Sequence, residues 1–300
     1  MKKKTYLFAL MAMVLTLGSC SDNENGIGGE TSKYITVSTS IGNMTRVATD
    51  AKGGQTFEEG DEISVYAWTG APTVAPETSE RVVNNAINKL TNGSWISTPQ
   101  MLWKNNREKH YFIGVYPTAA ISDLSAGEYT FDANKQTESD LLVAVNPDGL
   151  SYSADAQQTV PLTFTHVMAK LAVNLTYKNQ WGGIPTVEKV VVGNAAKEAT
   201  INYLTKVVTP STTAKEDFSL PEITENTKYV SVIIPQEEVT QLTIVIGGKN
   251  FVYDNGTPFK LESGKITTVN LEVGRDEIKL GDVKITDWED GSTFKGEALN

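Results

Sequence analysis

The sequence contains little of what metal sites and histidine-based catalysis require. Its 300 residues include a single cysteine, Cys20, and two histidines, His110 and His166. Neither histidine has a partner at the spacing of a zinc site, and no cysteine lies near either one. We therefore predict no catalytic residue, no metal and no cofactor, and we interpret the chain as not an enzyme. His166 is expected to be structural, and His110, which follows Lys109, is expected at the surface.

Basic residues are also scarce. Lysine and arginine total 26 against 36 aspartates and glutamates, the formal net charge is −10, and four residues are arginine. Removal of residues 1–19 as a signal peptide would take away three lysines and no acids, so 23 basic residues would remain against 36 acidic ones, a net charge of −13. Such a surface repels nucleic acid and anionic lipid. The composition therefore predicts an acidic body without a nucleic-acid partner.

Beyond the N-terminus, no apolar run is long enough to cross a bilayer. Residues 1–19 begin with three lysines and continue with an apolar run at 6–17 that is too short for a stable span, which predicts a signal peptide. The run ends in Leu17-Gly18-Ser19-Cys20, which resembles the lipobox of bacterial lipoproteins. Cys20 is then the lipidation site, carrying chains such as palmitate that anchor the protein to a membrane. The alternative is an ordinary secretion signal with an accidental cysteine.

Residues 20–32 are polar and rich in glycine, which predicts a flexible tether. Its acidic start, Ser21-Asp22, resembles the signal that sends some lipoproteins of gut and oral anaerobes to the outer face of the outer membrane. We therefore expect a surface-exposed lipoprotein of the cell outer membrane, in contact with the membrane through the lipid on Cys20.

The rest of the chain has the two-residue periodicity of β-strands. In residues 33–41 and 171–177, apolar and polar side chains alternate, so each strand has one buried face and one polar face. Turn signals separate further strand candidates, and Gly247-Gly248 between two apolar runs predicts a tight hairpin. These candidates are residues 62–68, 111–116, 141–145, 187–192, 229–234, 242–246, 251–253, 266–273 and 279–285.

Short strands at regular spacing, without alternating helices, predict an all-β protein with two β-sandwiches in series. A polar passage at 148–159 is the expected boundary, which divides the body into an N-terminal β-sandwich at 33–158 and a C-terminal β-sandwich at 159–300. Two stretches, residues 82–90 and 167–171, have helical spacing but could equally be irregular strands.

A set of short motifs, in a shared order, resembles the fimbrillin family. The order spans nearly the whole chain after Cys20, although each motif alone is an ordinary strand end. The motifs are FEEGDEISVY at 57–66, YFIGVYP at 111–117, DLL at 140–142, LTFTHVMAKL at 162–171, VIIPQ at 232–236 and ITDW at 285–288.

This resemblance implies two transthyretin-like Greek-key β-sandwich domains in tandem and a role in type V pili, the adhesive filaments of the fimbrium. It implies other pilus subunits as partners, in a homo- or hetero-polymer, and leaves open whether the chain is a stalk, anchor or tip subunit and which receptor it meets. In polymerising members, a protease cuts after an arginine that follows the first strand. That strand leaves, and a strand of a neighbouring subunit replaces it.

In this sequence the resemblance assigns the cut to the bond between Arg46 and Val47, the candidate protease maturation site; the alternative is an ordinary solvated loop arginine. The candidate displaced first strand presents Ile35, Val37, Thr39 and Ile41 on one face. The candidate donor strand lies at 278–285 and carries Ile278, Leu280, Val283 and Ile285, with Gly281-Asp282 interrupting the alternation, so that a bulge or turn is expected there.

Three other hypotheses remain open from the sequence. Five tryptophans could form an exposed platform for sugar rings, which would make the chain a glycan-binding surface lipoprotein. Two carboxylates could meet in space as a surface hydrolase requires. The acidic residues at 282, 287, 289 and 290 could bind calcium, although their spacing is not that of an EF-hand.

Overall fold

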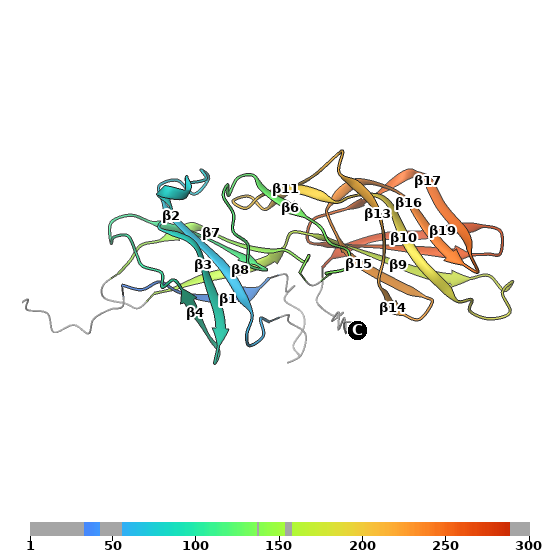
Figure 1. Cartoon of the computed structure of the whole chain (residues 1–300), viewed down its shortest axis with the longest axis horizontal. Coiled ribbons are helices and arrows are strands. Elements are labelled where there is room, and N and C mark those ends of the chain that lie inside the picture. The colour runs from blue at the N-terminus through green and yellow to red at the C-terminus, as the bar shows by residue number, and fades with distance from the viewer. Residues whose placement is uncertain (1–32, 43–55, 137, 154–157, 289–300) are drawn as a thin grey trace, which may run out of the picture.

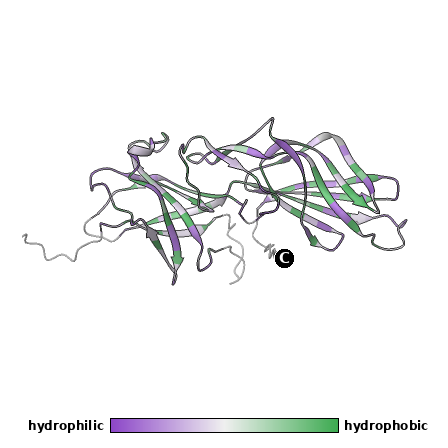
Figure 2. Cartoon of the chain, in the orientation of Figure 1, coloured by the Kyte–Doolittle hydropathy of each residue, from purple (hydrophilic) through white to green (hydrophobic). Residues whose placement is uncertain are grey.

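The computed structural model describes residues 33–42, 56–136, 138–153 and 158–288, and these form an almost entirely β structure (Figure 1). Hydrophobic and hydrophilic residues alternate along many of the strands (Figure 2), as expected for strands with one buried face. The described elements are β1 (Thr36–Ile41), β2 (Glu62–Thr69), η1 (Thr78–Glu80), β3 (Val83–Thr91), β4 (Ser94–Thr98), β5 (His110–Tyr116), β6 (Gly127–Thr130), β7 (Leu142–Leu150), β8 (Thr159–His166), β9 (Ala169–Tyr177), β10 (Val187–Ala196), β11 (Glu198–Asn202), β12 (Val207–Pro210), β13 (Lys215–Ser219), β14 (Glu222–Thr224), β15 (Lys228–Ile233), β16 (Gln236–Ile246), β17 (Lys249–Leu261), β18 (Lys265–Val273) and β19 (Ile278–Asp287).

The first half of the chain forms a seven-stranded sheet in the order β1-β8-β7-β5-β2-β3-β4. Its neighbours are antiparallel except β1 and β8, which are parallel. One face encloses a cluster that we call the N-terminal core, which includes Val65 of β2, Phe112 of β5 and Phe164 of β8. The opposite face carries Tyr66 and Ile113, which belong to a larger cluster, the main core.

The second half of the chain has a four-stranded sheet, β13-β10-β16-β17, and a five-stranded sheet, β14-β15-β9-β18-β19. Val173 of β9, Val190 of β10 and Leu242 of β16 all lie in the main core, so side chains of the two sheets pack together. A small sheet, β12-β11-β6, joins β6 of the first half to β11 of the second. The buried interior is therefore continuous between the two halves.

The change from one large sheet to the other falls between His166 and Ala169. The strand at 159–166, assigned above to the C-terminal unit, pairs with β7 and β1 in the seven-stranded sheet. The next strand, β9, pairs with β15 and β18. Alternation identifies a strand but does not indicate which sheet that strand joins. The polar passage at 148–159 therefore predicted a boundary that lies before the observed change of sheet.

Neither stretch with helical spacing is a helix, because residues 167–171 hold the break between β8 and β9 and the start of β9. Residues 82–90 fall largely in β3, where Asn85 has a φ of 56° and the pairing with β2 shifts register. This irregularity separates buried Val83 from buried Ala86 by three positions instead of two, which imitates a helical pattern. The hairpin at Gly247-Gly248 is confirmed, because Ile246 pairs with Lys249 and both glycines have positive φ, 57° and 70°.

Candidate assembly site around the first strand

Strand β1 lies at an edge of the seven-stranded sheet. It pairs in parallel with β8, from Thr36 opposite Thr159 to Ile41 opposite Phe164. The amide of Gly42 extends this pairing by donating to the carbonyl of Phe164 at 2.7 Å. Because β1 is at the sheet edge, its departure would leave the pairing of the other six strands intact.

The alternation predicted for this strand is confirmed, while its displacement stays a prediction. Ile35 and Val37 are 2% and 6% exposed and belong to the N-terminal core. The side chains that face inward are Ile35, Val37, Thr39 and Ile41, of which the last two are half-buried, and Ser38 and Ser40 are exposed. Removal of β1 would therefore uncover part of a hydrophobic core.

The start of β1 is also held on the side away from β8. The amide of Ile35 donates to the carbonyl of Met101 at 2.9 Å, and the amide of Trp103 donates to the carbonyl of Lys33 at 3.2 Å. We call this pairing of residues 101–103 with residues 33–35 the clip. The clip was not predicted from the sequence, although Met101-Leu102-Trp103 is an apolar run before a strand.

Beyond the clip, β1 and β4 border a groove of about 680 Å³. One hydrogen bond crosses it, from the indole Nε1 of Trp95 to Oγ1 of Thr39 at 3.0 Å. Its other lining residues include Val37, Ile41, Phe57 and Leu90. This groove, which we call the seam, runs along the strand predicted to be displaced and is lined by both apolar and hydroxyl side chains.

Phe57 connects this groove to the interior. Its ring makes edge contacts with Trp95, Tyr116 and Phe164 at centroid distances of 5.3, 5.3 and 5.1 Å. Burial, followed by the nearby carboxyl of Asp61, raises the pKa of Tyr116 to about 12, so this ring is neutral. The aromatic cluster stays uncharged and supports the seam from within. Phe57 was visible in the sequence only as the start of a family-like motif.

Strand β19, the candidate donor, is the edge strand of the five-stranded sheet and pairs with β18. Gly281 and Asp282 lie opposite the single residue Asn270, which is a β-bulge at the predicted interruption. Ile278 and Leu280 are half-buried, whereas Val283 and Ile285 are each 38% exposed. In this structure β19 therefore completes its own sheet, with its second half exposed.

Three of the other predicted site residues cannot be placed in the structure. Arg46 and Val47 follow soon after Gly42 and lie outside the described residues, as does Cys20.

Both histidines are buried, although the sequence predicted a surface position for His110. His110 is fully buried, so its expected surface position was wrong: it is the first residue of β5 and faces inward, whereas Lys109 is exposed. His166 is buried as a structural residue, with its ring stacked on Trp288 at 4.0 Å and Nδ1 2.9 Å from Oδ1 of Asp140.

The tryptophans do not form the platform that the glycan-binding hypothesis needs. Trp68, Trp103 and Trp288 are buried, and Trp95 and Trp181 are half-buried.

Within the described ranges, no group of three histidine, cysteine or acidic side chains could hold a metal ion. In the same ranges, no helix is long and apolar enough to span a membrane. Of the calcium candidates, Asp282 accepts a hydrogen bond from Asn270 at 2.6 Å, and residues 289 and 290 lie outside the described residues.

A sequence profile described as fimbrillin-like matches residues 45–288. The chain belongs to the fimbrillin-like family. The match begins beyond the end of β1 and ends at Trp288, so it includes the seam on the β4 side, the bulged β19 and the residue that stacks on His166. No curated protein matches the chain.

Solved structures support the same fold for this fimbrillin-like chain. A Bacteroides ovatus protein proposed to act in cell adhesion is 18% identical, with a TM-score of 0.63, and the match covers 85% of this chain and 98% of that one. A second such protein, from Bacteroides uniformis, is 18% identical with a TM-score of 0.56 over 78% and 93%. A fimbrial protein of Bacteroides vulgatus is 13% identical with a TM-score of 0.51 over 84% and 99%. At these identities the likeness concerns the fold alone.

Proposed function

We propose that this protein is a structural or accessory subunit, at the anchor or tip, of type V pili, and that it mediates cell adhesion through donor-strand polymerisation. The observation that carries the proposal is the position of β1. It is an edge strand, and Val37 on it and Ile35 just before it close a hydrophobic core beside an open groove. Loss of such a strand exposes unpaired backbone and apolar surface, which favours the addition of a strand from another chain.

The proposed partners are other pilus subunits, and the proposed location is the outer face of the outer membrane. Membership of the fimbrillin-like family supports both. Strand β19 is the proposed donor, because its second half presents Val283 and Ile285 at an exposed sheet edge. Its bulge at Gly281-Asp282 would limit the registers in which it can pair with a foreign groove.

The assembly step is tested by cutting the chain at Arg46 with an arginine-specific protease. Arg107 and Arg275 are exposed, so the test uses the R107K/R275K background, in which Arg46 and the buried Arg81 are the remaining arginines. Arg81 is retained because it donates to the carbonyl of Ile121 at 2.6 Å. After cleavage, the fragment ending at Arg46 is expected to leave and the protein to form ladders that resist mild denaturant.

The matched control is R46K in the same background, which keeps the positive charge but removes the cleavage site. It is expected to stay intact and monomeric. A protein that is cut at Arg46, retains the fragment and remains monomeric on a sizing column would contradict the proposed assembly step.

The membrane anchor is tested with Cys20→Ala. The variant is expected to lose labelled fatty acid and to leave the membrane fraction, because each buried methylene of the lipid contributes about 0.8 kcal/mol to anchoring. Growth with labelled palmitate followed by membrane fractionation provides the measurement. A variant that still takes up label and still sediments with membranes would contradict lipidation at Cys20.

A further inference from the structure

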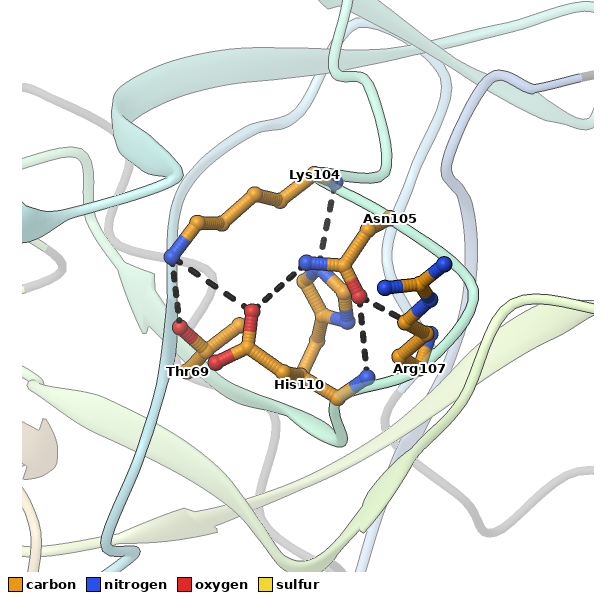
Figure 3. Close-up of polar contacts among 6 residues, drawn as sticks. Thr69, Lys104, Asn105, Arg107 and His110 are labelled. Carbon is orange, nitrogen blue, oxygen red and sulfur yellow. Dashed lines mark hydrogen bonds and ion pairs between the residues drawn. The ribbon is translucent and has the colours of Figure 1, made fainter.

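The clip that holds the start of β1 continues into a loop with an ordered polar network (Figure 3). Oδ1 of Asn105 accepts hydrogen bonds from the amides of Arg107 and Glu108, both at 2.9 Å. Nδ2 of Asn105 donates to the carboxylate of Glu108 at 2.6 Å. Nζ of Lys104 donates to Oγ1 of Thr69 on β2 at 3.2 Å. The loop is therefore fixed locally, and its attachment to the interior determines where residues 101–104 lie.

That attachment runs through His110. The amide of Lys104 donates to Nε2 of the His110 ring at 3.1 Å (Figure 3). The ring also meets Trp103, the last residue of the 101–103 segment of the clip, in an edge contact with a centroid distance of 5.0 Å and an interplanar angle of 90°. One fully buried side chain thus contacts the last residue of the clip segment, Trp103, and the residue that follows it, Lys104.

The hydrogen bond from Lys104 fixes the protonation state of the ring. Because Nε2 accepts, it carries no proton, and the proton of the neutral ring is on Nδ1. A second proton would enter at Nε2 and turn this acceptor into a donor that faces the amide of Lys104. The two N–H groups would then repel each other, and the amide would lose its partner.

We propose that His110 is a positioning residue that holds the clip closed over the start of β1, and that protonation of its Nε2 opens the clip. The structural change is the loss of the hydrogen bonds between residues 101–103 and residues 33–35, which leaves β1 attached through β8 alone at this end. Its consequence for assembly rests on the proposed function, whereas the opening of the clip does not.

Burial of the ring and the groups around it determine the pH range. Burial lowers the pKa of His110, while the backbone and carboxylate of Glu108 and the backbone of Leu150 oppose that shift and Lys104 adds to it. The residues paired with His110 on the neighbouring strands, Thr69 of β2 and Leu150 of β7, carry no ionisable group. Since the closed form binds the proton less readily than the open form, the clip is fully stable above the ordinary histidine pKa of about 6.5 and weakens as the pH falls below it.

Amide hydrogen exchange of the uncut protein tests the clip directly. Between about pH 7.5 and pH 4.5, after correction for intrinsic exchange, protection of the Ile35 and Trp103 amides is expected to fall about tenfold or more. The amide of Ile113, in the sheet interior between β2 and β7, is the internal reference and is expected to keep its protection. Unchanged protection at Ile35 while the His110 ring titrates in an NMR experiment would overturn the proposal.

Two variants separate His110 from other titrating groups. His110→Gln retains an acceptor near Nε2 but does not titrate, so protection at Ile35 is expected to be high and independent of pH. His110→Phe keeps a ring without an acceptor and is expected to weaken the clip about tenfold at every pH. A pH dependence in His110→Gln equal to that of the unmodified protein would also overturn the proposal.

Assembly provides a separate measurement. In protein cut at Arg46, release of the β1 fragment is expected to be faster at about pH 5 than at pH 7.5, and this acceleration is expected to disappear in His110→Gln. If the clip opens in the exchange experiment but the cut protein never polymerises, the proposed function fails while the clip stands. If polymerisation occurs without any dependence on His110, the clip fails while the proposed function stands.

Discussion

Replacing Val37 by aspartate is expected to detach β1 without any proteolysis, whereas the same replacement at Ser38 is expected to leave it in place. The two residues are neighbours on one strand, but Val37 is 6% exposed in the N-terminal core and Ser38 is exposed. A carboxylate at position 37 would be buried without a partner, at a cost of about 3–5 kcal/mol. Detachment of the edge strand is the simplest way to return that carboxylate to water.

Hydrogen exchange of residues 35–41 and urea unfolding together measure this effect. In Val37→Asp, the amides of β1 are expected to lose protection while the central strands β2 and β5 keep theirs, because β1 is an edge strand whose neighbour in the sheet is β8. Ser38→Asp introduces the same side chain and the same charge on the same strand but at an exposed position, so it controls for the charge itself. Equal loss of protection in both variants would contradict the assignment of the Val37 face to the core.

The same substitution connects structure to assembly. If an empty first-strand position is what allows subunits to join, Val37→Asp is expected to form ladders without cleavage at Arg46. In that case the protease would act only by removing the strand. A detached β1 without ladders would show that removal of the strand is insufficient and that the cut itself, or another subunit, is required.

Local features of this fold could be predicted from the sequence because they depend on neighbouring residues. The inward face of β1 follows from its alternation, and the Gly247-Gly248 hairpin follows from two residues that tolerate positive φ. The bulge in β19 was likewise visible as a break at Gly281-Asp282. In each case the physical cause lies within a few residues of its effect.

Features that depend on pairing in space could not be predicted in the same way. Nothing in residues 159–166 indicates that they pair in parallel with a strand more than a hundred residues earlier. Likewise, the charged neighbour of His110 suggested exposure, but alternate residues of a strand face opposite sides, so Lys109 indicates nothing about the next residue. The clip was missed for the same reason, because its two segments are distant in sequence.

The second large effect is expected for Trp288→Ala, at the end of the last described strand. Trp288 is 1% exposed, and its amide donates to the carbonyl of Gly264 at 3.1 Å. Its ring stacks on His166 of β8 at 4.0 Å and 6°, and Nζ of Lys170 on β9 lies 4.0 Å from its centroid. The indole therefore lies between the end of the seven-stranded sheet and the start of the five-stranded one.

Removal of this indole leaves a cavity where the two sheets meet, so Trp288→Ala is expected to lower the free energy of unfolding by about 3–5 kcal/mol. Trp288→Phe keeps a ring for His166 and is expected to lose much less. Trp181→Ala is the matched control, because that indole is half-buried at the opposite end of β18. Urea unfolding followed by hydrogen exchange locates the damage: exchange at β8 and β9 is expected to rise together. A loss confined to β19 would mean that Trp288 secures only its own strand, and that the sheets are joined by the rest of the main core.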